Sequence, residues 1–136
     1  MPGTFVIYTD GASRGNPGLA SIGAVVYAEA DGDLVEVATV SEPIGVDTNN
    51  VAEYKAVIEG LKAVAAFDPD RVTLRADSQL LIRQLKGEYR VKAANLKPLF
   101  IEAKRLVSSL GRVKLEHVPR EQNKVADGLA NAALDG

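Results

Sequence analysis

Four acidic residues in this chain of 136 residues stand where acids that serve only solubility are not expected. Asp10 follows an apolar, β-branched run, and Asp77 follows a second run of that kind. Glu53 lies in the first turns of a predicted long helix, and Asp127 lies in a predicted helix near the end of the sequence. Each acid has apolar neighbours, so we expect each to lie close to a packed sheet.

Carboxylates that converge in a partly buried site repel one another, and a bound divalent cation relieves that repulsion. Hard ions such as Mg²⁺ prefer oxygen ligands and are commonly held by a few carboxylates together with substrate phosphate. A pair of ions roughly 3.5–4 Å apart can stabilise both the attacking and the leaving oxygen of an in-line phosphoryl displacement. The four acids therefore indicate metal-dependent phosphoryl transfer.

Each acid also has a structural interpretation when it is taken singly. Asp10 and Asp77 could be turn formers at strand ends, and Glu53 a charge that favours a helix N-terminus. Asp127 could be an ordinary acid on a helix surface. Only the four acids together, with the loop motifs around them, favour a common site.

The elements that would position these acids follow from hydrophobic periodicity and turn residues. Three strands come first and form an antiparallel meander with a turn at 31–33; four helices and two further strands follow. The segment "DTNN" supplies capping chemistry ahead of the first helix. The predicted strands cover 4–10, 21–30, 34–44, 71–77 and 112–118, and the predicted helices 51–67, 78–85, 96–110 and 124–134.

This order predicts an α/β fold with a five-stranded mixed sheet, three strands antiparallel and the rest parallel, flanked by helices. Ligands of such sheets bind beyond strand ends, near the point where the strand order switches. Asp10 and Asp77 are both predicted to end strands, so we expect them to lie close together.

Length and composition fit one ordinary domain over residues 1–136, since 46% hydrophobic and 25% charged residues are typical of a globular protein. The chain has no Cys, which excludes disulfides and thiol catalysis and fits a cytoplasmic location. No segment is apolar over enough residues to enter a membrane.

The net charge of −2 conceals an asymmetry between two parts of the chain. Residues 83–124 contain eleven Lys or Arg and four Glu, a local +7, so the remainder carries −9. Such a split is a hint of contact with a polyanion. A solvated helix face with scattered lysines is an equally good explanation.

Four motifs then identify a family: "YTDGASRGNPG" (8–18), "TNNVAEYKAVIEGL" (48–61), "LRADSQLLIRQLKG" (74–87) and "VPREQNKVADGLAN" (118–131). Their order and spacing resemble type 1 ribonuclease H (ribonuclease HI) from about residue 4 to residue 134, in the compact subtype without a basic protrusion. The family's acidic quartet matches Asp10, Glu53, Asp77 and Asp127. The resemblance implies a ribonuclease H-like fold.

The resemblance further implies an endonuclease, acting as a monomer, that hydrolyses the RNA strand of RNA–DNA hybrids. It would leave 5′-phosphate and 3′-hydroxyl ends and use two Mg²⁺ ions, for which Mn²⁺ can substitute. Asp10 would contact both ions, Asp127 the ion that activates water, and Glu53 and Asp77 the ion near the leaving oxygen.

Residues for substrate contact are also carried over from the family. Asn16, Asn49 and Asn50, with Glu53, would bind 2′-hydroxyls, which distinguish RNA from DNA. Gln79 would reach a base edge or sugar and Thr48 a DNA phosphate, while Gly11, Ser13 and Gly15 would let the hybrid backbone approach. The alternative for Asn49 and Asn50 is helix capping, and for Asn16 a turn.

The chain departs from many relatives in two places. The segment "KGEYRVKAAN" (86–95) is too short for a basic protrusion, so Lys86, Arg90 and Lys92 would share that work, with Tyr89 where relatives often have Trp. The sole His, His117, aligns either with the mobile loop His of relatives or with the preceding strand. We prefer the strand, because "VKLEHV" alternates; Arg120, Glu121 or Lys124 would then replace the loop His.

Two other functions remain open from the sequence alone. One is a binding module that keeps the fold without cutting. The other is the nuclease domain of a larger reverse-transcriptase-like or bifunctional protein. The presence of all four acids disfavours the binding module.

Overall fold

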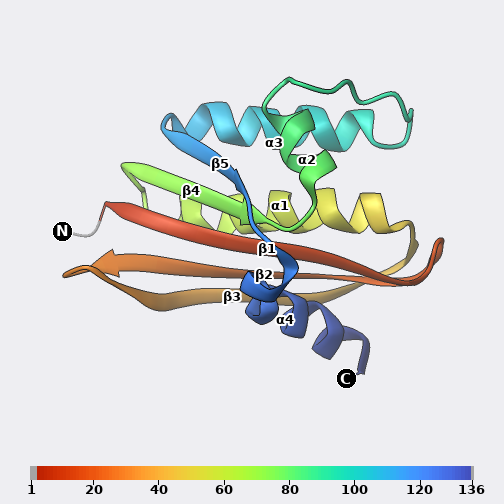
Figure 1. Cartoon of the computed structure of the whole chain (residues 1–136), viewed down its shortest axis with the longest axis horizontal. Helices are drawn as coiled ribbons and strands as arrows, with labels where there is room; N and C mark the ends of the chain where they lie inside the picture. Colours follow the sequence, from red (N-terminus) through yellow and green to blue (C-terminus); the bar gives the residue numbers. More distant parts are fainter. Residues whose placement is uncertain (1–2, 136) are drawn as a thin grey trace.

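The computed structural model describes residues 3–135 and contains one five-stranded sheet with helices on both faces (Figure 1). The strand order is β3-β2-β1-β4-β5, with β2 antiparallel to β1 and β3, and β4 parallel to β1 and β5. This is the predicted mixed sheet. The strands are β1 (Thr4–Gly15), β2 (Gly18–Ala30), β3 (Asp33–Asp47), β4 (Arg71–Ala76) and β5 (Val113–His117); the helices are α1 (Asn49–Ala65), α2 (Gln79–Leu85), α3 (Lys97–Leu110), the 3₁₀ helix η1 (Arg120–Gln122) and α4 (Lys124–Asp135).

The antiparallel half of the sheet begins with two hairpins. Asp31 and Gly32 form the loop between β2 and β3 with φ angles of 52° and 84°. Positive φ at both loop residues is what a tight hairpin turn matched to the twist of the strands requires, and Asp-Gly is a favoured pair for it. The predicted turn at 31–33 is therefore present.

The predicted end of the first strand near Asp10 is wrong. β1 continues through the small residues that follow and pairs with β2 as far as the Gly15–Gly18 pair. The pairing partner supplies the backbone hydrogen bonds, so context outweighs the weak strand propensity of Gly and Ser. The parallel neighbour β4 does stop early, because its pairing with β1 ends at Thr9–Ala76. Asp10 is thus the first residue of β1 beyond the end of β4.

The helix boundaries follow the sequence closely, with one informative shift. α1 begins at Asn49, two residues before the predicted start, because Thr48 is its N-cap and accepts a hydrogen bond from the Val51 N–H at 3.3 Å. The interpretation of Asn49 and Asn50 as capping residues is therefore wrong. Ser78 caps α2 as predicted, accepting from the Leu81 N–H at 3.2 Å.

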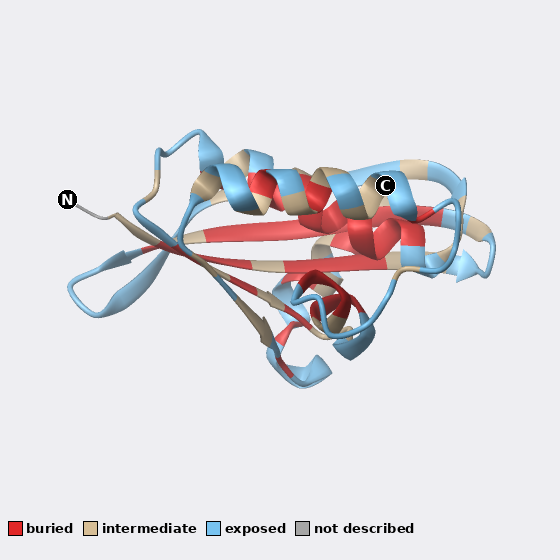
Figure 2. Ribbon diagram, turned by 90° about the horizontal axis from the view of Figure 1, so that it is seen from above, coloured by how far each residue is buried: buried red, intermediate tan, exposed pale blue. Residues whose placement is uncertain are grey.

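The main core lies between the sheet and α1, α2 and α3, and Figure 2 shows buried residues concentrated along the strands and the helix sides that face them. β1 contributes Phe5 and Ile7 to it, and α1 contributes Val57, Leu61 and Val64. α4 packs on the opposite face, against β1, β2 and β3 (Figure 1). Among residues 3–135, no helix combines the length and the hydropathy needed to cross a bilayer.

Candidate active site

Three of the four acids meet at the edge of the sheet where β4 ends. One carboxylate oxygen from each of Asp10, Glu53 and Asp77 lies within 4.8 Å of the other two. Asp10 comes from β1, Glu53 from α1, and Asp77 from the residue directly after β4. Asp127, in the first turn of α4, borders the same hollow and contributes to the raised pKa of Asp10. The sequence prediction that the four acids converge holds, with Asp127 beside the tight group rather than inside it.

Glu53 reaches the site because α1 lies unusually close to β1. The Gly11 N–H donates a hydrogen bond to Glu53 Oε1 at 2.7 Å. A Cβ on Gly11 would stand 2.3 Å from the Ala52 carbonyl carbon and from the Glu53 nitrogen. The space beside Gly11 is thus filled by α1, and Gly11 also borders the acidic hollow, so its contact with a nucleic-acid backbone stays a prediction. Gly15 is likewise explained by its φ of 114° in the β1–β2 turn.

Asp127 reaches the site because α4 lies equally close to the other face. Gly23 pairs with Asp10 across β1 and β2, and a Cβ there would stand 2.2 Å from the Ala126 carbonyl oxygen. Two serines fix the next turns of α4, since Ser41 Oγ donates to the Leu129 carbonyl at 2.6 Å and Ser21 Oγ donates to the Ala130 carbonyl. Acids from both layers therefore meet at one sheet edge.

The electrostatics of the cluster are those of carboxylates crowded together with little solvent. Asp10 is 8% exposed and Glu53 is 6% exposed. Burial, followed by repulsion from Glu53, raises the pKa of Asp10 to about 9. Burial also raises the pKa of Glu53 to about 7, against the opposing effect of the Gly11 N–H. Without a cation, this pair of carboxyl groups therefore binds a proton more tightly than isolated carboxyl groups do.

The donor set of this cluster fits a hard divalent cation. Across the described part of the chain, no Lys or Arg forms an ion pair with any of the four acids. Buried carboxylates without a cationic partner are costly unless a metal neutralises them. All the available ligands are oxygens, the type that Mg²⁺, Mn²⁺ and Ca²⁺ prefer.

Comparison with known proteins agrees with this geometry. A family model described as reverse transcriptase-like matches residues 8–133. Ribonuclease HI of Halobacterium salinarum is 44% identical over 128 residues, which are 94% of this chain and 63% of that protein. The crystal structure of that archaeon's ribonuclease H1 superposes with a TM-score of 0.92 over 98% of both chains. The chain belongs to the type 1 ribonuclease H family.

One further relative is a domain of a larger protein, and another has been solved with a nucleic acid bound. The N-terminal ribonuclease H domain of a bifunctional Mycobacterium tuberculosis protein is 42% identical, with a TM-score of 0.91 over 97% of this chain and 99% of that one. This chain spans 35% of the full mycobacterial protein. LC11 ribonuclease H1, isolated from compost, has been solved with an RNA/DNA hybrid; it is 39% identical, with a TM-score of 0.87 over 96% of both chains.

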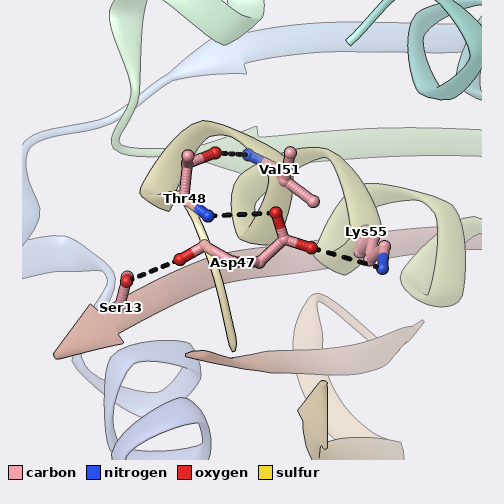
Figure 3. Close-up of polar contacts among 5 residues, drawn as sticks. All are labelled: Ser13, Asp47, Thr48, Val51 and Lys55. Atoms are coloured by element: carbon pink, nitrogen blue, oxygen red, sulfur yellow. Dashed lines mark hydrogen bonds and ion pairs between the residues drawn. The ribbon is translucent and has the colours of Figure 1, made fainter. Parts of the chain in front are cut away.

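Two of the three asparagines predicted to bind 2′-hydroxyls, Asn16 and Asn49, are hydrogen-bonded to each other at a corner beside the acids. The Asn49 N–H donates to Asn16 Oδ1 at 3.1 Å, so Asn16 joins the β1–β2 turn to the start of α1. Figure 3 shows Ser13 Oγ donating to the Asp47 carbonyl at 2.9 Å, and Asp47 Oδ1 accepting from the Thr48 N–H at 3.0 Å. Ser13 and Asn49 border the hollow that contains the acids.

The other predicted substrate residues lie outside that hollow. Thr48 uses its oxygen as the helix cap (Figure 3), and its hydroxyl hydrogen stays available to a phosphate. Asn50, Gln79 and Lys92 are exposed. The Tyr89 ring is 48% exposed, with the Arg83 guanidinium 5.2 Å from its centre. Lys86 lines a separate hollow along β5 with Arg75, Lys114 and His117.

The two alignments of His117 are resolved by its position. His117 is the last residue of the edge strand β5, is exposed, and borders the separate hollow along β5. The preferred alignment, with His117 on the strand, is confirmed. Of the three loop residues considered as replacements, Arg120 borders the acidic hollow, while Glu121 and Lys124 border a different one.

Three further polar residues border the acidic hollow and were not predicted as contacts: Arg14, Ser78 and Asn131. Asn131 follows Asp127 by one helical turn, so the two side chains lie on the same face of α4. This spacing could have indicated Asn131 once Asp127 had been identified. The Arg14 guanidinium forms an ion pair with Asp135. This contact joins the part of β1 beyond Asp10, here called the β1 arm, to the end of α4. That ion pair has no sequence signal, because its partners are far apart in the chain.

Proposed function

We propose that this protein is an endonuclease that hydrolyses the RNA strand of RNA–DNA hybrids and leaves 5′-phosphate and 3′-hydroxyl ends. The observation that carries the proposal is the meeting of Asp10, Glu53 and Asp77 within 4.8 Å, with Asp127 on the border of the same hollow. Membership of the type 1 ribonuclease H family and the hybrid-bound LC11 relative support the substrate.

The family is metal-dependent, and Mg²⁺ is the proposed ion, in a pair, with Mn²⁺ as a substitute. Such ions supply Lewis-acid polarisation of the scissile phosphate and activation of water. Asp10 would serve both ions; its contacts within the hollow include Glu53 and Asp77, and Asp127 borders the same hollow. Glu53 would be held for this role by the Gly11 N–H.

Selection of RNA is assigned to the corner made by Asn16, Asn49 and Asn50. Asn49 and Asn50 are the first residues of α1, which carries Glu53, and Asn16 accepts a hydrogen bond from the Asn49 N–H, so 2′-hydroxyls of a bound RNA strand would pass here. The hydrogen bond from the Asn49 N–H to Asn16 Oδ1 joins the β1–β2 turn to the start of α1, which would preorganise this corner. Thr48, Gln79, Lys86, Tyr89 and Lys92 are proposed to extend the contact along both strands.

The proposal includes a monomer acting in the cytoplasm, in keeping with the absence of Cys. A second possibility is that the activity belongs to one domain of a larger protein, which the bifunctional mycobacterial relative favours. A binding module that does not cut is disfavoured by the complete acidic cluster, since the loss of one carboxylate would already abolish metal binding.

A cleavage assay tests the proposal. The wild type and an Asp77→Asn variant are incubated with a hybrid labelled on its RNA strand, with Mg²⁺ and then with EDTA. We expect cleavage of the RNA strand by the wild type only, and its loss in EDTA. Asp68→Asn is the matched control, because Asp68 is exposed on a loop and its φ of 49° suits Asn.

Two outcomes would contradict parts of the proposal. Binding of the hybrid without cleavage would identify a binding module. Equal cleavage of double-stranded DNA would contradict the roles given to Asn16, Asn49 and Asn50.

A further inference from the structure

Asn123 is a buried residue whose contacts connect the segments that bear three of the four acids. It lies between η1 and α4 and is 1% exposed. Its Nδ2 donates one hydrogen bond to the Thr9 carbonyl oxygen at 2.9 Å and another to Asp77 Oδ2 at 3.0 Å. Its backbone carbonyl accepts a hydrogen bond from the Asp127 N–H at 3.1 Å. Thr9 directly precedes Asp10, so one side chain and its backbone connect β1, the end of β4 and the start of α4.

The orientation of the Asn123 amide is fixed by its partners. Both acceptors of Nδ2 are oxygens, so a rotation that exchanged Nδ2 and Oδ1 would set oxygen against oxygen. In the present orientation Oδ1 is buried and, within residues 3–135, has no hydrogen-bond partner. A buried acceptor left unpaired costs about 1–3 kcal/mol, so this amide is a poor choice for stability alone. The two hydrogen bonds that Nδ2 donates, to Thr9 and Asp77, therefore explain better than stability why an asparagine occupies this position.

The bond to Asp77 sets which of its carboxylate oxygens is free. Asp77 Oδ2 receives the Asn123 N–H, and the carboxylate group as a whole cannot turn without breaking that bond. Asp77 also follows β4 directly and lies outside the strand's ladder of hydrogen bonds. Asn123 therefore supplies the restraint that the sheet does not.

We propose that Asn123 is a positioning residue that holds Asp77 in its metal-binding orientation and joins α4 to the strand that carries Asp10. This inference rests on the proposed metal-dependent function. Groups that orient metal ligands in this way typically change metal affinity or activity about 10–100-fold when they are removed.

The test measures Mn²⁺ binding to the full chain by titration calorimetry, without nucleic acid, for the wild type, Asn123→Ala and Asn123→Ser. Serine keeps a favourable residue at the start of α4 but is too short to bridge Thr9 and Asp77. We expect Mn²⁺ affinity to fall about 10–100-fold in both variants. Cleavage should then require correspondingly more metal, with the turnover number returning toward that of the wild type when metal is in excess.

Gln84→Ala is the matched control. Gln84 is also a buried amide with two hydrogen bonds, accepting from the Tyr54 hydroxyl at 2.6 Å and donating to the Arg90 carbonyl at 3.3 Å, on α2. The Gln84→Ala substitution should lower thermal stability without changing Mn²⁺ affinity. Thermal unfolding of each variant identifies losses that come from destabilisation.

Two outcomes would overturn the inference, and they differ in what else they overturn. If the wild type binds Mn²⁺ and both Asn123 variants bind it equally well, Asn123 does not position Asp77, and the proposed function stands. If the wild type binds no Mn²⁺, the metal site itself is wrong and the role of Asn123 is lost with it.

Discussion

The backbone N–H of Gly11 donates a hydrogen bond to the carboxylate of Glu53 across 2.7 Å, which joins the strand that carries Asp10 to the helix that carries Glu53. The contact needs a glycine, because a Cβ at this position would lie 2.3 Å from the backbone of α1. A second glycine, Gly23, allows the same close approach of α4 on the other face. The separation of the acids is therefore set by backbone contacts, which side-chain movements cannot easily change.

Gly23→Ala should lower both stability and cleavage. The new methyl group meets backbone atoms of α4, at 2.2 Å from the Ala126 carbonyl oxygen, so the helix that carries Asp127 must shift. We expect a loss of about 1–3 kcal/mol in the free energy of unfolding, measured by urea denaturation, with reduced cleavage of hybrid at a temperature where the variant is folded.

Gly128→Ala, in the helix α4 that packs on Gly23, provides the control for Gly23→Ala. A Cβ on Gly128 meets no atom within 4 Å, so alanine there should raise stability by up to about 1 kcal/mol through helix propensity. Cleavage should be unchanged. Full activity of Gly23→Ala would show that the close packing of α4 on the sheet does not matter to the site.

Asp10→Asn should abolish cleavage and stabilise the metal-free protein at alkaline pH. The pKa of Asp10 is raised from 3.8 in its ordinary state to about 9 in the folded protein, so the folded state binds its proton more tightly than the unfolded state. Wild-type stability is then fully present below about pH 4 and is lost as pH rises toward 9. Asparagine removes this dependence.

The measurement for Asp10→Asn is thermal unfolding in EDTA between pH 5 and 9. The variant's advantage over the wild type should grow with pH and reach about 1–3 kcal/mol at the alkaline end. Adding Mn²⁺ should stabilise the wild type alone, more strongly at higher pH because metal and protons compete for the carboxylates. A constant difference across this pH range would contradict the raised pKa.

Arg120→Ala should reduce turnover about tenfold or more, while His117→Ala should change it only a few-fold. Arg120 borders the acidic hollow, where a charge-assisted hydrogen bond to phosphate is worth about 1.5–3 kcal/mol. His117 borders a separate hollow along β5. Steady-state cleavage rates give the comparison, with Arg120→Lys as the variant that keeps the charge. A loss of several orders of magnitude in His117→Ala would reverse the assignment.

Replacing both Lys86 and Lys92 by Ala should weaken hybrid binding and make it less dependent on salt. Each lysine that neutralises a phosphate contributes about one unit to the slope of log affinity against log salt. Binding is measured in EDTA at several salt concentrations, so that no cleavage occurs. Lys62→Ala is the control, since Lys62 is exposed on α1 and lies 3.5 Å from Glu59. An unchanged slope would contradict contacts between these two lysines and phosphates of the hybrid.

The acidic cluster and the sheet order could be predicted from the sequence because each has a local signal. Apolar runs end near Asp10 and Asp77, and the alternation of strands and helices fixes their common edge. The β1 arm beyond Asp10 could not be predicted, because its Gly and Ser residues become strand only through pairing with β2. The role of Gly11 could not be predicted either, because it depends on the packing of α1 on β1.

Predictions of the substrate contacts were less complete for a similar reason. Asn49 and Asn50 are good capping residues, yet Thr48 takes that position. Asn131 borders the hollow only because α4 returns to the sheet edge from the far end of the chain. Long-range packing of this kind leaves no mark in local sequence.

The placement of the acids on two opposite layers has a consequence for the folding of the chain. Asp127 joins the other three only after α4 has docked on the face of the sheet away from α1. A folding intermediate that has formed the sheet and α1 but not α4 would still carry an incomplete site. A complete site therefore cannot form before α4 has docked, and cleavage would report that docking more directly than helix content does.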